Sequence, residues 1–198
     1  TAYLKAKQMK ILVEDLFEYT KVRQPTTKLN LVTFDLNQML EQFAADFALE
    51  AEKKGITITV ETSPTPFYFE ADTEKLVRVF NNLFSNALKY GKGATIISLE
   101  ARQVGTEAII TVKNNGQSIP KESLQQLFDR FYRVEESRNQ ETGGTGLGLA
   151  IAQSIVALHG GYIYAKSNPE WTSFIIHLPL VRNVNPQQLS NIDEKANL

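Results

Sequence analysis

The sequence predicts an α+β fold: a two-layer α/β sandwich in which a mixed, mostly antiparallel sheet is covered on one face by helices, preceded by one amphipathic helix. Helical segments and antiparallel hairpins are interleaved along the chain, without the regular strand and helix alternation that builds a parallel sheet. A chain of 198 residues is also long enough to bury a sizeable core.

Composition excludes several classes of protein. The formal net charge of −1 gives no electrostatic reason to expect nucleic acid as a partner. The absence of cysteine excludes a disulfide scaffold, thiol catalysis and cysteine zinc sites. The most apolar stretch, residues 146–158, is too short to span a bilayer. Because Thr1 already lies inside a predicted helix, we expect the chain to be a piece of a longer protein.

The first element is a helix over residues 2–20. Small and apolar side chains recur there at alternating steps of four and three residues, the spacing of a helix that packs against another helix. The members of this stripe are Ala2, Ala6, Met9, Val13, Leu16 and Thr20. Pro25 marks the end of this first unit, residues 1–25, and residues 26–30 are predicted to be a linker.

The main domain is predicted to cover residues 31–180. A short strand at 31–34 leads to a helix that Asp35 caps and that ends before Gly55. Strands at 56–61 and 67–69 precede a second helix, which Asp72 or Thr73 caps and which ends at Tyr90. A hairpin of strands 95–102 and 108–113 turns around Gly105.

The second half of the domain carries a short helix that reaches Phe131, a polar loop rich in Gly and Thr, and a helix over about 146–158. Strands at 162–166 and 172–178 close the domain. The tail, residues 181–198, is polar and aperiodic, so we expect it to be disordered.

A polar stripe on the second helix is the first candidate site. Asn82, Asn86 and Lys89 are spaced i, i+4 and i+7, so their side chains share one face. A carboxamide oxygen is a hard, neutral ligand for Mg²⁺, and a lysine can meet a phosphate as a point charge. The alternative is an ordinary solvated helix face.

A glycine-rich run at residues 143–149 is the second candidate. It opens a helix, where free backbone N–H groups and the positive end of the dipole favour an anion. It matches neither a P-loop nor a dinucleotide-binding fingerprint, since no Lys-Ser or Lys-Thr follows and no strand leads into it. The alternative is a flexible glycine hinge.

Four segments together resemble a known family. In order they are residues 82–90 (NLFSNALKY), 114–116 (NNG), 128–133 (FDRFYR) and 144–149 (GTGLGL). They resemble, in order and spacing, the N, G1, F and G2 boxes of sensor histidine kinases, which implies the Bergerat ATP-binding fold shared with gyrase, Hsp90 and MutL. Residues 113–115, 118–120 and 159–164 are further similar to the vancomycin-resistance sensor kinases of the VanS type.

The resemblance implies a role for each motif residue. Asn86 would coordinate Mg²⁺, Asn82 and Lys89 would support the phosphates of ATP, and Arg133 would reach the γ-phosphate. Residues 134–143 would form a lid over the nucleotide. The cofactor-binding residues would be Tyr90, Asn114, Gly116, Gly144, Thr145, Gly146, Leu147, Gly148 and Thr172, with Tyr90 lining the nucleotide, Asn114 and Thr172 at the adenine and the amides of Gly144, Gly146 and Gly148 at the phosphates.

Three residues depart from the family pattern. Asn114 stands where the family usually has an Asp that accepts a hydrogen bond from the adenine amino group, so it keeps an acceptor oxygen but lacks the charge. Ser118 replaces the second glycine of the G1 box, and Trp171 replaces a small residue before Thr172. These two larger side chains predict a tighter pocket than usual.

Neither histidine lies in a phosphoacceptor motif. His159 follows a helix and precedes two glycines, which indicates a helix C-terminal role, and His177 lies in a strand as an ordinary sheet residue. The first helix resembles the second helix of a dimerisation and phosphotransfer hairpin. The phosphoacceptor helix is therefore expected before Thr1.

The resemblance implies a protein-histidine kinase fragment that transfers the γ-phosphoryl of ATP to a histidine on the first hairpin helix. Its implied partners are that hairpin, a cognate response regulator and a second copy in a homodimer; its implied place is the cytoplasmic side of a plasma-membrane sensor kinase. One alternative is a hydrolytic ATPase like gyrase or MutL, and the other a degenerate ATP-binding module that only docks partners. Asn82 disfavours the hydrolytic class, which has a water-activating Glu at that position.

Overall fold

The structure is a computed structural model that describes residues 2–24, 26–134 and 144–180. Its main sheet has five strands in the order β2 (Thr57–Glu61), β4 (Ile96–Val104), β5 (Glu107–Asn114), β7 (Thr172–Pro179) and β6 (Tyr162–Ser167). Only β2 and β4 run parallel, and the other neighbours are antiparallel. The mixed, mostly antiparallel sheet that the sequence predicts is confirmed.

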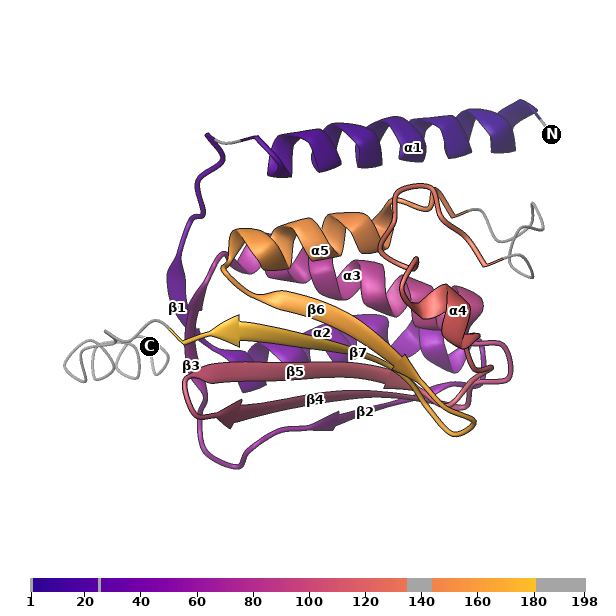
Figure 1. The fold of residues 1–198 in the computed structure, drawn as a ribbon. Helices are drawn as coiled ribbons and strands as arrows, with labels where there is room; N and C mark the ends of the chain where they lie inside the picture. The colour runs from indigo at the N-terminus through magenta and orange to yellow at the C-terminus, as the bar shows by residue number, and fades with distance from the viewer. Residues whose placement is uncertain (1, 25, 135–143, 181–198) are drawn as a thin grey trace.

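Three helices cover one face of this sheet (Figure 1): α2 (Leu36–Glu52), α3 (Thr73–Tyr90) and α5 (Gly148–Leu158). The core lies between the two layers. Phe80, Leu83 and Phe84 of α3 are fully buried, as are Ile97 and Ile110 of the sheet. The apolar stripe of α3 packs into this core, so the polar side chains of α3 lie on the other faces of the helix.

Strands β1 (Val32–Asp35) and β3 (Tyr68–Ala71) form a separate two-stranded antiparallel sheet and do not join the main one. The expectation of a single sheet is wrong in this detail. Both strands are four residues long because a helix follows each of them directly. Asp35 accepts a hydrogen bond from the Asn37 N–H at 3.0 Å and Asp72 from the Lys75 N–H at 3.1 Å, so the predicted caps end both strands.

Two predicted helix boundaries are corrected. The helix α4 (Lys121–Leu124) stops well before Phe131, whose φ of 63° lies outside the helical region and whose N–H donates to the Gly146 carbonyl at 2.9 Å. The helix α5 begins at Gly148 and not at Gly146, because Gly146 has a φ of 72°. The hydrogen bond between the loops at Phe131 and Gly146 therefore stands where the sequence predicts the end of one helix and the start of the next. The tail at 181–198 lies outside the described residues.

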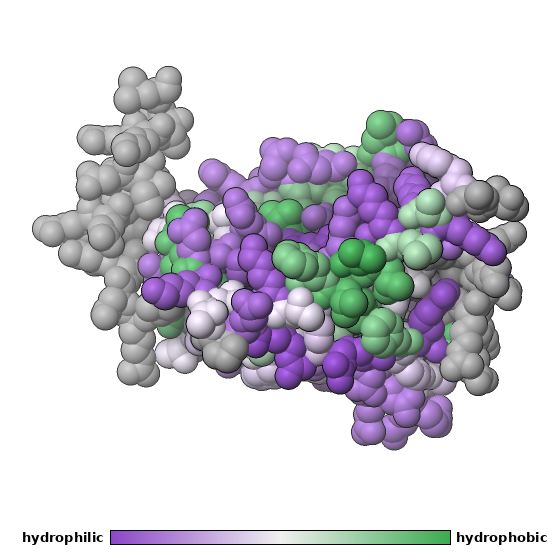
Figure 2. Space-filling view, turned by 90° about the horizontal axis from the view of Figure 1, so that it is seen from above, coloured by the Kyte–Doolittle hydropathy of each residue, from purple (hydrophilic) through white to green (hydrophobic). Residues whose placement is uncertain are grey.

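The helix α1 (Ala2–Val22) lies over α5 as a third layer (Figure 1). It contacts the domain through a face on which Asp15, Tyr19 and Val22 are buried. Met9, Val13 and Leu16 of the predicted stripe are exposed, and Figure 2 shows an apolar patch on this side of the molecule. The docked face is thus not the face that the spacing predicts. No helix in the described part of the chain combines the length and hydropathy that crossing a membrane requires.

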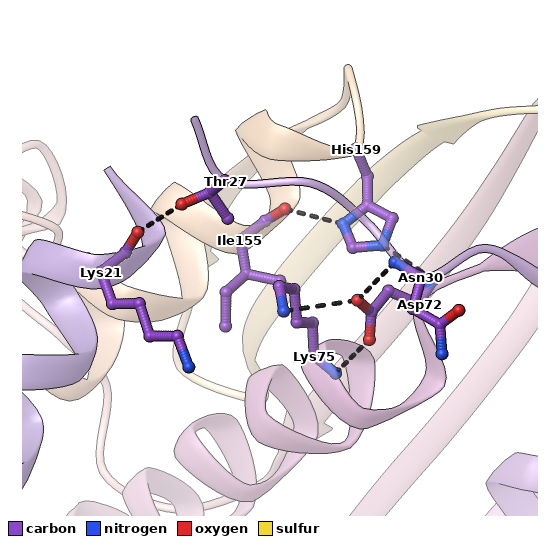
Figure 3. Close-up of polar contacts among 7 residues, drawn as sticks. All are labelled: Lys21, Thr27, Asn30, Asp72, Lys75, Ile155 and His159. Atoms are coloured by element: carbon purple, nitrogen blue, oxygen red, sulfur yellow. Dashed lines mark hydrogen bonds and ion pairs between the residues drawn. The ribbon is translucent and has the colours of Figure 1, made fainter. Parts of the chain in front are cut away.

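A polar cluster joins the linker to the domain (Figure 3). The Asp72 carboxylate accepts hydrogen bonds from the N–H groups of Asn30 and Lys75 and pairs with the Lys75 ammonium at 3.3 Å. Burial alone would raise the pKa of Asp72, but these donors and the ammonium outweigh burial and lower it below 3.8. The Asp72 carboxylate therefore remains charged while it holds the linker at Asn30.

His159 belongs to the same cluster. One ring nitrogen, Nδ1, lies 2.8 Å from the Ile155 carbonyl and must donate to it, while Nε2 accepts from the Asp72 N–H at 3.2 Å. Only a neutral imidazole satisfies both contacts. Burial lowers the pKa of His159 below its ordinary 6.5, which also favours the neutral ring. The helix C-terminal role predicted for His159 is confirmed by this geometry.

We expect the free energy of unfolding to fall as the pH is lowered through 6.5. Below this pH the unfolded chain binds a proton at His159, whereas the folded chain binds it only at a lower pH. The two states therefore differ by at most one bound proton at His159, and this difference sets the slope of the free energy of unfolding against pH. His159→Gln should flatten this part of the profile in chemical denaturation between pH 7.5 and 5.5. Identical slopes in the variant and the parent would show that His159 does not titrate across unfolding.

Candidate nucleotide-binding site

A cleft of about 530 Å³ opens between α3, the loop that leads into α5, and the adjoining ends of β5 and β7. It gathers nearly all the residues that the motifs predict. The predicted residues in its lining are Asn82, Asn86, Lys89, Tyr90, Asn114, Arg133, Gly144, Thr145, Gly146, Gly148 and Thr172. Gly116 and Leu147 are not in the lining: Gly116 packs against the backbone of Gly91, and the Leu147 side chain is fully buried in the core.

The polar stripe of α3 forms one wall. Asn82 and Asn86 are half-buried, and Lys89 is exposed at the rim. The Asn82 Nδ2 group is buried and has no hydrogen-bond partner among the described residues. A buried donor without a partner is costly, and a bound acceptor would satisfy it. A buried donor without a partner disfavours the simple solvated face.

The glycine loop forms the opposite wall. A Cβ atom on Gly144 would collide with the Tyr90 hydroxyl, and one on Gly146 would approach the Phe131 backbone to 2.8 Å. These close contacts hold the loop in place, which favours a built site over a hinge. The N-cap residue of α5, Leu147, has an apolar side chain that makes no hydrogen bond to the start of the helix. The N–H groups of the first turn therefore remain available to an anion.

Apolar side chains gather in the cleft around the ends of β5 and β7. Asn114 and Thr172 are buried there and lie directly opposite each other in the β5–β7 ladder. The side chains of Ile119, Leu127 and Phe174 line the same pocket. An amide and a hydroxyl set among apolar walls suit a flat heterocycle, with the polar groups fixing its orientation.

The other two departures from the family pattern, Ser118 and Trp171, lie in different places. Ser118 lies in the lining of the cleft, as predicted. Trp171 does not: it lies against Lys113, whose ammonium is 4.8 Å from the ring centre, outside the cleft. The prediction that Trp171 narrows the pocket is therefore wrong, because its side chain packs on a neighbouring strand.

Arg133 and Val134 line the cleft where the chain leaves the F box. Residues 135–143, which make up nearly all of the predicted lid, lie outside the described residues. Arg133 is half-buried and makes contacts of its own within the structure. Arg133 thus lies in the lining of the same cleft as the glycine loop.

The lining also contains residues that were not predicted, among them Arg78, Ile11 and Asp15. Arg78 precedes Asn82 by one helical turn, so extending the polar stripe backwards along α3 would have found it. Ile11 and Asp15 come from α1, and no local pattern identifies them because they reach the cleft only through the docking of that helix.

The cleft also bears on the predicted metal. No group of three acidic or histidine side chains in the described ranges could hold a metal ion by itself. Asn86 offers one neutral oxygen in the lining. Such a donor set fits Mg²⁺ that arrives with a polyphosphate, because Mg²⁺ keeps several waters and takes its other ligands from phosphate oxygens.

Comparisons with known proteins agree with this geometry. Residues 71–182 match the family described as "Histidine kinase-, DNA gyrase B-, and HSP90-like ATPase". The chain is 39% identical over 175 residues to the sensor protein VanS of Enterococcus faecium, covering 88% of this chain and 45% of VanS. It is 34% identical over 171 residues to the sensor protein kinase WalK of Staphylococcus aureus, covering 85% of this chain and 41% of WalK. The chain spans less than half the length of these two relatives.

Among solved structures, full-length ShkA in complex with AMPPNP is similar with a TM-score of 0.77 and 26% identity, covering 88% of this chain and 36% of that chain. The predicted family and fold are confirmed by these matches. This chain therefore belongs to the histidine kinase-, DNA gyrase B- and HSP90-like ATPases.

Proposed function

We propose that the chain binds ATP with Mg²⁺ in this cleft and acts as the catalytic domain of a sensor histidine kinase. One observation carries the proposal: a single cleft is lined by the α3 stripe, by the glycine loop and by the Asn114–Thr172 pair. The first two suit phosphates and the third suits a base. The similar sensor proteins supply the reaction class.

The nucleotide would lie with its adenine between Asn114 and Thr172. The Asn114 carboxamide oxygen would accept from the exocyclic amino group, in place of the carboxylate usual in the family. The Thr172 hydroxyl already exchanges a hydrogen bond of 2.7 Å with Ser167, which holds its side chain in place. The phosphates would extend along α3, past Lys89, toward Asn82 and the glycine loop.

Asn86 would hold Mg²⁺ against the phosphate oxygens, where the ion would offset negative charge during transfer. The buried Asn82 amide would donate to a phosphate oxygen, and Lys89 would add a positive charge at the rim. These groups align the triphosphate and stabilise charge, which is the main contribution that a protein makes to phosphoryl transfer.

In the transfer step, the imidazole nitrogen of an acceptor histidine on another helix would attack the γ-phosphorus in line. A nitrogen–phosphorus bond forms as the bond to the bridging β,γ-oxygen breaks, and ADP leaves with that electron pair. Arg133 would stabilise the charge on the transferred group. This chain would not need to supply a strong base, since the acceptor nitrogen brings its own lone pair.

The residue at position 82 separates this proposal from hydrolysis. A gyrase-like or MutL-like ATPase needs a carboxylate there to take a proton from water, and an amide cannot accept one. The docking-module alternative predicts that no nucleotide binds. The buried, unpartnered donor of Asn82 favours a site that still takes a ligand over a degenerate one.

The partners and location are part of the proposal. The acceptor histidine would lie on the other helix of a hairpin to which α1 contributes, and the exposed side chains of Met9, Val13 and Leu16 are an apolar face that such a hairpin or a second copy would cover. A response regulator would receive the phosphoryl group. The domain would lie on the cytoplasmic side of a membrane-anchored homodimeric sensor.

Arg133→Ala is expected to spare ADP binding, within about twofold, and to slow ATP-dependent transfer by roughly 100-fold or more, because a contact to the γ-phosphate contributes only when that group is present. Calorimetry with ADP and single-turnover transfer from ATP would measure the two effects. Equal losses for ADP and ATP would assign Arg133 a structural role.

The function itself is tested by transfer in trans. The chain is incubated with ATP labelled at the γ-phosphate, Mg²⁺ and a separate dimeric hairpin that carries its phosphoacceptor histidine, taken from the VanS relative. We expect slow, acid-labile labelling of the hairpin and none when its histidine is replaced by Gln. Release of labelled phosphate without labelling of the hairpin would favour the hydrolytic alternative.

A further inference from the structure

One carboxylate from α1 lies at the end of the cleft. Asp15 is only 8% exposed, although the other residues between Lys5 and Phe17 of this helix are exposed. Its Oδ1 accepts from Arg78 Nη2 at 2.7 Å, and its Oδ2 accepts from the Thr145 hydroxyl at 2.7 Å. Both partners are in the lining of the cleft, and so is Asp15 itself.

The groups that hold Asp15 are those that proteins use to hold a phosphate: a guanidinium and a hydroxyl beside a glycine loop at a helix N-terminus. The guanidinium and the hydroxyl both already have partners in this structure. The Thr145 hydroxyl has one proton, which it donates to Asp15, while its oxygen accepts from the Leu147 N–H at 3.3 Å. The Arg78 Nε atom lies 2.7 Å from a Glu18 carboxylate oxygen, also on α1. The α1 carboxylates thus occupy an anion site.

The position of this anion site along the cleft identifies what it would otherwise bind. Arg78, Asn82 and Asn86 follow one another at four-residue steps on the same face of α3, so Arg78 lies about 12 Å along the helix from Asn86. Asn114 lies near Gly91, just beyond the C-terminal end of α3, and Thr172 lies opposite Asn114 in the β5–β7 ladder. In the orientation proposed above, the terminal phosphate of a triphosphate points toward Arg78, and a diphosphate ends short of it.

We propose that Asp15 is an internal anion that occupies the terminal-phosphate end of the cleft, and that Arg78 and Thr145 become phosphate ligands when α1 leaves. The inference rests on the proposed function for the orientation of the nucleotide. It assigns Arg78 to the binding site and makes the docked α1 a competitor of ATP. By linkage, a nucleotide with a γ-phosphate weakens the docking of α1 by the same factor that docked α1 weakens that nucleotide.

The first test is Asp15→Asn, which keeps the size of the side chain and removes the charge. We expect the affinity for Mg²⁺ and AMPPNP to rise about fivefold or more, within the range usual for coupled sites, and that for Mg²⁺ and ADP to change less than twofold. Glu14→Gln is the matched control. It removes the same charge one residue away on α1, but Glu14 is 61% exposed and pairs only loosely with Lys10, so neither affinity should change.

The role of Arg78 is tested in the same background. With Asp15 neutralised, Arg78→Gln should remove the gain for AMPPNP and leave ADP within twofold, because only the γ-phosphate reaches the guanidinium. If the double variant retains the full gain, Arg78 is not a phosphate ligand and that assignment fails.

A second measurement needs no variant. In the parent chain, hydrogen exchange at the amides of α1 around Asp15 should accelerate when Mg²⁺ and AMPPNP saturate the cleft, and should change less with Mg²⁺ and ADP. Unchanged AMPPNP affinity in Asp15→Asn together with unchanged exchange in α1 would overturn the competition while leaving nucleotide binding intact. Failure of the parent and the variant to bind either nucleotide would instead overturn the proposed function.

Discussion

Asn86→Ala should abolish Mg²⁺-dependent nucleotide binding, with a loss of affinity of about 100-fold or more. Asn86 is the one predicted metal ligand of the chain, and it lies in the lining of the cleft. Without its oxygen, Mg²⁺ loses its protein ligand and the phosphates lose their link to α3. Because the side chain is half-buried at the cleft and packs in no core layer, the fold should survive. Calorimetry with AMPPNP, with and without Mg²⁺, measures the effect.

Asn81→Ala is the matched control for this variant. It makes the same chemical change on the same helix, at a half-buried residue that is not in the lining of the cleft. We expect it to bind as the parent does, and both variants to keep the parent's circular dichroism spectrum. If the affinity of Asn86→Ala for AMPPNP equals that of the parent both with Mg²⁺ and without it, Asn86 has no role at the metal.

The second large effect is an absence of self-phosphorylation. Incubated alone with ATP labelled at the γ-phosphate and Mg²⁺, this chain should bind nucleotide and acquire no acid-labile label. Its two histidines are both engaged outside the cleft lining: His159 bonds to Ile155 and Asp72, and His177 lies 2.9 Å from a Glu107 carboxylate oxygen and stacks on Tyr162. Neither presents a free imidazole to the cleft.

Acid-stable and acid-labile label should be compared on the parent chain and on His159→Gln and His177→Gln. Labelling that one of these substitutions removes would identify that histidine as an acceptor and refute its structural role. When the separate hairpin is supplied, transfer should appear but remain slow, since the acceptor is no longer tethered and its local concentration is low.

Much of the fold could be predicted because local chemistry determines where its elements begin and end. Asp35 and Asp72 cap helices as expected, and Gly55 and Gly105 take positive φ at the predicted ends and turns. The failures are long-range. Residues 125–131 do not continue α4, because the Phe131 N–H donates to the carbonyl of Gly146, fifteen positions along the chain. No periodicity within a segment reports such a partner.

The site shows the same division. Motif residues on α3 and the glycine loop meet at the cleft because each motif sits at the end or on one face of a predicted element. Asp15 could not be found in this way. The spacing on α1 indicates the Met9, Val13 and Leu16 stripe, whereas the docked face centres on a carboxylate whose partners, Arg78 and Thr145, are 63 and 130 positions away.

ATP binding in this cleft is tested most directly by titrating the parent chain with AMPPNP and Mg²⁺ while following the amide resonances of the chain. We expect saturable binding, with the largest shifts at the Gly144–Gly148 amides, along the α3 face of Asn82 and Asn86, and at Asn114 and Thr172, and with little change at the β1–β3 sheet. Absence of saturable binding, or shifts that leave the glycine loop and α3 unchanged, would contradict the assignment of this cleft to ATP.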